Sequence, residues 1–214
     1  MHWVSTTAFI THCWRRWHPR PERGWWLGLF VSILIAGPVR AGVEFEQMRL
    51  ERQDGELHLH VSLKLELGPS VEEALAKGVA VYFVAEAELM RDRWYWYDRR
   101  LGQASRYYRL AYQPLTRQWR LQVSSEPLHA GGAVSVIAQG FDSLQAALDV
   151  VRRQSGWKLA DASEIDPEAR QYVSYRFRID LSQLPRPFQI GVSSQPEWNL
   201  NLTRMQRIAP ETRP

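Results

Sequence analysis

The feature that most constrains the fold is a strict alternation of apolar and polar residues early in the chain. Apolar side chains occupy every second position from Leu57 to Leu67, and polar side chains occupy the positions between them. A period of two places all the apolar side chains on one face of a β-strand. Val43–Gln53 alternates less regularly, and the Asp54-Gly55 pair that follows it is typical of a hairpin turn. The sequence therefore predicts a β-hairpin with one buried face.

The rest of the chain predicts more short strands and two short helices. One helix begins at Ser70, with Glu73 in capping-box position and Gly78 after its end. The other runs from Asp142, as its cap, to Arg153, with apolar residues at helical spacing. The remaining predicted strands are 79–90, 93–99, 104–112, 117–124, 172–180, 188–192 and 198–202. Many short strands without β-α-β alternation predict a mainly β fold, an antiparallel β-sandwich that is immunoglobulin-like in general architecture.

The first 41 residues differ in composition from the remainder. Arginines at 15–23 precede an uncharged apolar segment at 25–37, and Val39-Arg40-Ala41 places small residues where signal peptidase reads them. A 13-residue helix would extend roughly 20 Å, less than the ~30 Å hydrocarbon core of a membrane. We expect residues 1–41 to be a signal peptide and the mature protein to be periplasmic. The alternative is an inner-membrane anchor formed by residues 25–37.

Charge and cysteine content exclude several classes of function for the mature chain. The first 41 residues carry five of the 27 basic and one of the 23 acidic residues, so the remainder has 22 of each and no net charge. A neutral domain lacks the basic footprint of a nucleic-acid binder. The only cysteine, Cys13, lies in the leader, which excludes disulfides and thiol chemistry from the mature part. We expect one β-rich domain at 42–207 and a flexible tail at 208–214.

The densest functional candidate is an aromatic–arginine surface. Trp94 and Trp96 would share one face of a strand and Tyr95 and Tyr97 the other. If one pair lies in the core, the other pair must contact a second layer, a partner or solvent. Trp, Tyr and Arg are enriched in binding hot spots; the alternative is that both faces are covered within the domain. The next hairpin continues the pattern. The candidate binding residues are Arg93, Trp94, Tyr95, Trp96, Tyr97, Arg109, Tyr112, Arg117 and Trp119.

Other polar residues could form binding sites or could be ordinary surface residues. The arginines of this region, Arg106 among them, could form an anion pocket or ion pairs with nearby carboxylates. His58 and His60 could share a metal, but no spacing typical of a metal site accompanies them, and we interpret them as solvated histidines. No nucleophile elbow, P-loop or dinucleotide fingerprint is present in the sequence. We expect no catalytic residue, metal or cofactor.

Motifs spread over the chain give it a family resemblance. They are Arg93-Trp94-Tyr95-Trp96, Tyr108-Arg109-Leu110 with Tyr112 and Leu115-Thr116-Arg117, Phe141 with Leu144 and Ala147-Leu148, Leu181-Ser182-Gln183-Leu184-Pro185 with Pro187-Phe188-Gln189, and Trp198-Asn199-Leu200. From about Val43 to Arg207 the chain resembles an exported bacterial family known as domain of unknown function 4390. Arg186 stands where the family pattern has Lys. The resemblance implies a signal segment, transfers no catalytic residue and suggests an envelope sensor kinase as a partner.

Together these features predict an exported cell-envelope protein that is not an enzyme and that binds another protein through the aromatic–arginine surface. The alternative is a glycan- or lipid-binding envelope module that uses the same rings. A hydrolase with a dispersed site is a third possibility. No contact with nucleic acid is expected, and contact with the membrane is expected only through an uncleaved N-terminal segment.

Overall fold

A computed structural model describes residues 41–93, 97–128, 136–166, 169–192 and 194–208. All of them belong to one compact unit, Val39–Pro214. No helix within these ranges is long and apolar enough to cross a membrane.

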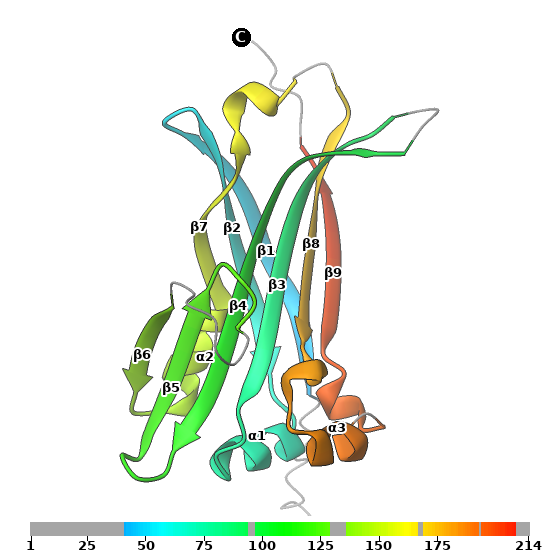
Figure 1. The fold of residues 1–214 in the computed structure, drawn as a ribbon. Coiled ribbons are helices and arrows are strands. Elements are labelled where there is room, and N and C mark those ends of the chain that lie inside the picture. Colours follow the sequence, from blue (N-terminus) through cyan, green and yellow to red (C-terminus); the bar gives the residue numbers. More distant parts are fainter. Residues whose placement is uncertain (1–40, 94–96, 129–135, 167–168, 193, 209–214) are drawn as a thin grey trace, which may run out of the picture. The chain divides into compact units, whose positions relative to one another are not determined.

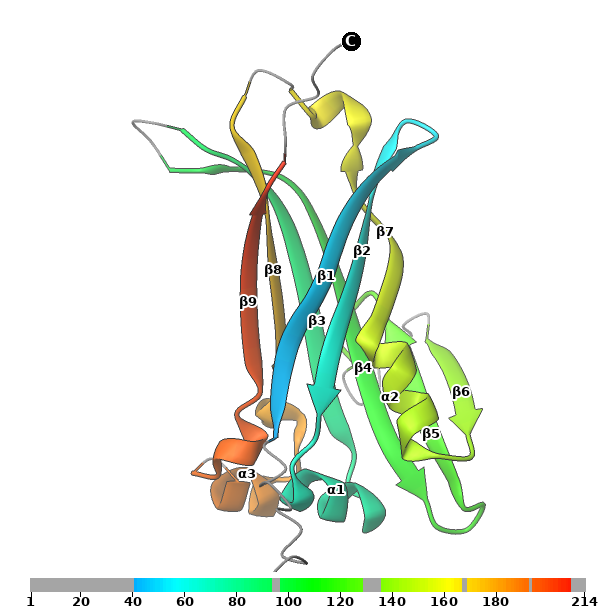
Figure 2. The same cartoon turned by 180° about the vertical axis from the view of Figure 1, so that it is seen from behind.

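Two antiparallel sheets form this unit (Figures 1 and 2). The small sheet has the order β1-β2-β7, and the large sheet has the order β6-β5-β4-β3-β8-β9. The small-sheet strands are β1 (Gly42–Gln53), β2 (Glu56–Glu66) and β7 (Arg153–Asp161). The large-sheet strands are β3 (Val81–Arg91), β4 (Arg99–Gln113), β5 (Gln118–Ser124), β6 (Ile137–Phe141), β8 (Gln171–Ile179) and β9 (Asn201–Arg207). The predicted mainly β, antiparallel fold is confirmed.

The core lies between the sheets, where the alternation in β2 predicts it. The apolar side chains of β2 are buried from Leu57 through Leu65. On the facing side of the large sheet, Phe83 stacks on Phe177 with ring centroids 5.9 Å apart. Trp157 of β7 contacts Tyr175 of β8 at a ring distance of 6.3 Å, which joins the two sheets. Burying each such side chain contributes about 1.5–3 kcal/mol.

The described residues also form three short α-helices: α1 (Pro69–Ala76), α2 (Leu144–Arg152) and α3 (Arg186–Val192). Helix α2 packs against β2, β5, β6 and β7. Helices α1 and α3 lie at one end of the sheets (Figures 1 and 2). At the start of α1 the carboxylate of Glu197 accepts hydrogen bonds from the backbone N–H of Ser70, at 2.9 Å, and from its hydroxyl. These bonds connect α1 to the short 3₁₀ turn Pro196–Trp198.

Several predicted elements are wrong. Phe188–Val192 is not a strand but most of helix α3, because Pro187 lies in the first helical turn, where its missing N–H is not needed. Arg93–Arg99 is not a strand, since within it Arg93, Tyr97 and Asp98 belong to the β3–β4 connection. The last strand begins at Asn201 rather than at Trp198, which lies in a 3₁₀ turn.

The two predicted helices exist but begin differently. Gly68, not Ser70, is the N-cap of α1, and Glu73 bonds to Lys77 at 2.6 Å instead of reaching back. Gly78 follows the helix with φ of 84°, as its position predicts. The cap of α2 is Ser143 rather than Asp142. Two strands, β6 and β7, were not predicted at all.

Candidate functional site

The hairpin tip is the connection between β3 and β4, and we use the name for its described residues, Arg91–Arg93 and Tyr97–Arg100. In both views the β3–β4 hairpin bends away from the sheets at this point (Figures 1 and 2). Tyr97 has 89% of its surface exposed, and Arg93 and Arg99 are exposed beside it. Trp94, Tyr95 and Trp96 lie outside the described residues. The tip therefore presents an aromatic ring and arginines to solvent.

Contacts from β8 hold the base of the tip in place. The Tyr172 hydroxyl donates to Asp98 Oδ2 at 2.6 Å, and this bond raises the pKa of Tyr172 to about 12. The Arg100 guanidinium pairs with Glu88 Oε1 at 2.9 Å. The backbone N–H of Asp92 donates to the carbonyl of Arg170 at 2.9 Å. Asp98 and Glu88 are engaged at the base, whereas the side chains of Asp92, Arg93 and Arg99 have no ion pair with any described residue.

The other predicted residues lie at the far end of β4. Tyr112 and Trp119 face each other across the β4–β5 pair, with ring centroids 4.9 Å apart. Both rings are half-buried, and Trp119 packs against the core. Arg117 occupies the turn after β4 with φ of 54° and is exposed to solvent. These aromatic rings close the edge of the core rather than extending the hairpin tip.

Arg109 lies between the two ends, on the outer face of the large sheet. Its Nε donates to the Tyr82 hydroxyl at 3.2 Å and its Nη1 to Gln122 Oε1 at 3.1 Å. Arg99 and Tyr112 are 13 residue steps apart along β4, about 43 Å at ~3.3 Å per residue. The structure thus separates the described residues of the predicted aromatic–arginine surface into three places: the hairpin tip, Arg109, and the far end of β4 with its Tyr112–Trp119 pair.

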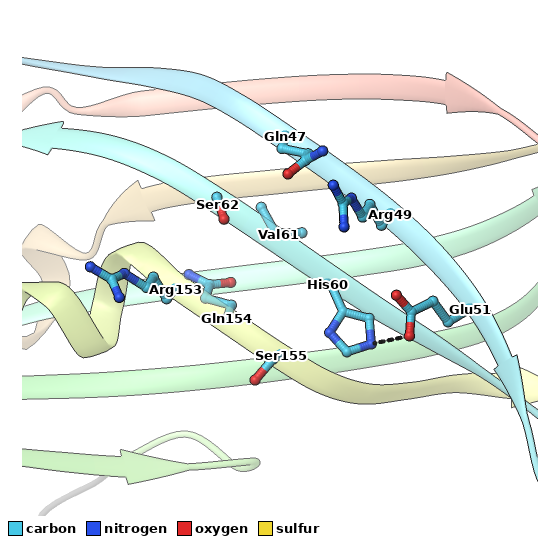
Figure 3. A pocket seen from close by; sticks show the side chains of 9 residues that line it. All are labelled: Gln47, Arg49, Glu51, His60, Val61, Ser62, Arg153, Gln154 and Ser155. Atoms are coloured by element: carbon cyan, nitrogen blue, oxygen red, sulfur yellow. Dashed lines mark ion pairs between the residues drawn. The ribbon is translucent and has the colours of Figure 1, made fainter.

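The two histidines of β2 lie on the outer face of the small sheet. The Nε2 atom of His58 is 3.4 Å from Glu56, and that of His60 is 3.6 Å from Glu51. Figure 3 shows His60 directed at Glu51 in a hollow of about 220 Å³, with Ser62 beside it on β2 and Gln154 on β7. Within the described ranges no three His, Cys, Asp or Glu side chains cluster as metal ligands would. His129 lies outside these ranges.

Sequence reasoning missed a larger groove of about 670 Å³ between β4, β5 and β7. Arg106 of β4 lies over the Trp157 ring, with its guanidinium carbon 4.8 Å from the ring centroid. Arg106 Nη2 also donates to the carbonyl of Ser155 at 3.0 Å. The only signal in the sequence is Gly156 inside a stretch of strand, which is typical of a β-bulge. Among the described residues, this groove and the hairpin tip are two surfaces that are suited to binding.

Comparison with known proteins adds a family but no activity. A family model described as "Domain of unknown function (DUF4390)" matches residues 40–208. This match confirms the resemblance inferred from the motifs. No curated protein and no solved structure matches the chain.

Proposed function

This chain belongs to the DUF4390 family, and we propose that it is a non-enzymatic interaction domain of the cell envelope that binds a partner protein through the hairpin tip. The observation that carries this proposal is the 89% exposure of Tyr97 between the exposed Arg93 and Arg99. Such residues dominate the energy of many protein interfaces. The intervening sequence, Trp94-Tyr95-Trp96, adds three more aromatic residues.

The charges of the tip favour an acidic partner surface. The described residues of the tip include four arginines, at 91, 93, 99 and 100, against two carboxylates, Asp92 and Asp98, so the net charge of the tip is positive. Opposite charge on the partner would speed association and select against other surfaces. An envelope sensor kinase, suggested by the family resemblance, is one candidate partner.

Export is part of the same proposal. Strand β1 begins at Gly42, directly after the Ala41 that a signal peptidase would read, so cleavage there would leave the folded unit intact. We expect mass spectrometry of the native protein to give Gly42 as its first residue. Recovery of the intact N-terminus in the membrane fraction would instead support anchoring by residues 25–37, and recovery in the cytoplasm would contradict the proposal.

Site-specific photocrosslinking in cells tests the binding proposal. A photoreactive amino acid replaces Tyr97 in one variant and Leu115 in the control, because Leu115 is also fully exposed but lies in the β4–β5 turn. We expect position 97, and not position 115, to give one discrete protein adduct. An adduct with glycan or lipid alone would favour the alternative module, and the same adducts from both positions would contradict a role for the tip.

A further inference from the structure

We propose that the groove beside Arg106 binds an amphipathic anion, a carboxylate or phosphate carried on an apolar chain. The groove has a volume of about 670 Å³, within the ~300–1,000 Å³ range of small-molecule sites. This site is separate from the hairpin tip and does not depend on the function proposed for it.

The fold opens this space through two local irregularities. Strand β4 pairs with β5 only from Tyr107 to Gln113, so its stretch up to Arg106 has no β5 neighbour. In β7 the pairing with β2 passes from Trp157 directly to Gln154, which leaves Ser155 and Gly156 as a bulge. Gly156 has φ of 64°, and a Cβ built there would meet no atom within 4 Å. The groove is lined by the bulged part of β7 and by the part of β4 that has no β5 neighbour.

The groove is positively charged, and no acidic side chain in its described lining neutralises that charge. Of the residues that the structure describes, the lining includes Arg106 and Lys158 but no Asp or Glu. Lys158 is already engaged, with its Nζ 2.6 Å from Glu56 and 3.0 Å from Asp161. Arg106 contacts only neutral groups among the described residues: the Trp157 ring, the Ser155 carbonyl and the Tyr108 hydroxyl. Its half-buried guanidinium therefore has donors left for an anion, and such charge-assisted bonds are strong.

The walls of the groove suit an apolar chain. Val123, Val150 and the Trp157 ring line it, together with Ile137 of β6. Ile137 is 63% exposed although it lies on the inner side of its sheet, paired with Val123. A bound chain would remove this apolar surface from water, with a gain of about 25 cal/mol per Å². An apolar wall beside a single available cation matches a ligand with one anionic end.

Calorimetric titration of the full-length chain tests the proposal. The probes are octanoate and octyl phosphate, below their micelle concentrations, with octanol as a neutral probe of equal chain length. We expect saturable binding of both anions and at least tenfold weaker binding of octanol. R106Q should weaken anion binding at least tenfold, since it removes a charge-assisted hydrogen bond. R120Q removes an exposed arginine of β5 that does not line the groove, and it should bind as the wild type does.

A second variant keeps the test independent of the structural contact that Arg106 makes with Ser155. I137E adds a carboxylate at a solvent-exposed position of the lining, so it should repel the anions without harming the fold. Thermal unfolding of each variant checks that it is folded. Equal affinity for octanol and octanoate would overturn the proposal. So would anion binding that is unchanged in I137E and in folded R106Q, or the absence of saturable binding.

Discussion

At Gly102 the backbones of β4 and β7 approach so closely that a side chain has no room. A Cβ at this position would lie 2.1 Å from the carbonyl oxygen of Leu159 and 3.0 Å from Ala160 Cβ. Both neighbours belong to a strand of the opposite sheet, so relief would require the two sheets to separate locally. Only glycine permits this contact.

We expect G102A to lower the free energy of unfolding by about 2–3 kcal/mol, as overpacking does in a tight core. Urea unfolding followed by circular dichroism measures the change. Gly140 is the matched control, because a Cβ there would meet Gln118 Oε1 at 3.5 Å, an ordinary contact. Equal losses in G102A and G140A would show that the sheets are not in close contact at Gly102.

Tyr108 gives a pH-dependent prediction. Burial raises its pKa to about 12, although the positive charge of Arg106 opposes the rise. Because an unfolded chain releases this proton near pH ~10, stability present below pH 10 is lost as the pH rises to 12. The expected loss is about 3 kcal/mol, and burial of Tyr175 acts in the same direction.

We expect Y108F to reduce this alkaline loss, measured as the urea midpoint between pH 9 and pH 12. The Tyr108 hydroxyl is buried and has no hydrogen-bond partner among the described residues. The nearby Arg106 guanidinium is its main polar neighbour, so removing the hydroxyl should change the free energy of unfolding at neutral pH by less than about 1 kcal/mol. An identical alkaline loss in wild type and Y108F would contradict the assignment.

At the scale of elements, α2 carries the clearest difference between prediction and structure. The Ser143 hydroxyl accepts a hydrogen bond from the backbone N–H of Ala146 at 3.2 Å, whereas Asp142 is exposed ahead of the cap. Two adjacent residues with good capping side chains cannot be ranked from sequence alone, because the strand before the helix determines which one takes the extended cap conformation.

We expect S143A to lower the free energy of unfolding by about 1 kcal/mol, the usual effect of losing an N-cap. D142A should change it by less than about 0.5 kcal/mol, as is usual for exposed positions. Thermal and urea unfolding of both variants test this. A larger effect for D142A would mean that the helix begins one residue earlier.

At the scale of the whole molecule, the two ends of β4 lie in different surroundings. Tyr97 lies at the exposed hairpin tip, whereas Trp119 packs against Tyr112 and the core at the other end. Sequence motifs placed these rings in one surface because they are close along the chain. A strand of 15 residues separates them in space.

We expect Y97A to abolish partner capture from cells while leaving thermal stability unchanged. W119A should do the reverse, with a stability loss of about 2–3 kcal/mol and normal capture by the folded fraction. Affinity pull-down and thermal unfolding of the same two preparations separate the effects. Loss of capture in W119A at a temperature where it is folded would mean that the far end of β4 also contacts the partner.

The sequence by itself determined the elements whose pattern is local. The alternation in Leu57–Leu67 defined β2 and its buried face, Asp54-Gly55 defined the turn before it, and the spacing of Leu144 and Leu148 defined α2. These signals depend on which side chains share one face of a single strand or helix.

Only the tertiary structure revealed β7, the groove and the separation of the aromatic–arginine residues. In β7 the bulge at Gly156 shifts the alternation by one residue. Before the bulge the even-numbered Gln154 is buried, and after it the odd-numbered Trp157 and Leu159 are buried. Gln154 is tolerated in the core because it accepts a hydrogen bond from the Tyr175 hydroxyl at 2.9 Å. Strand pairing and bulges depend on partners far away in the sequence, and the side-chain pattern of one segment does not record them.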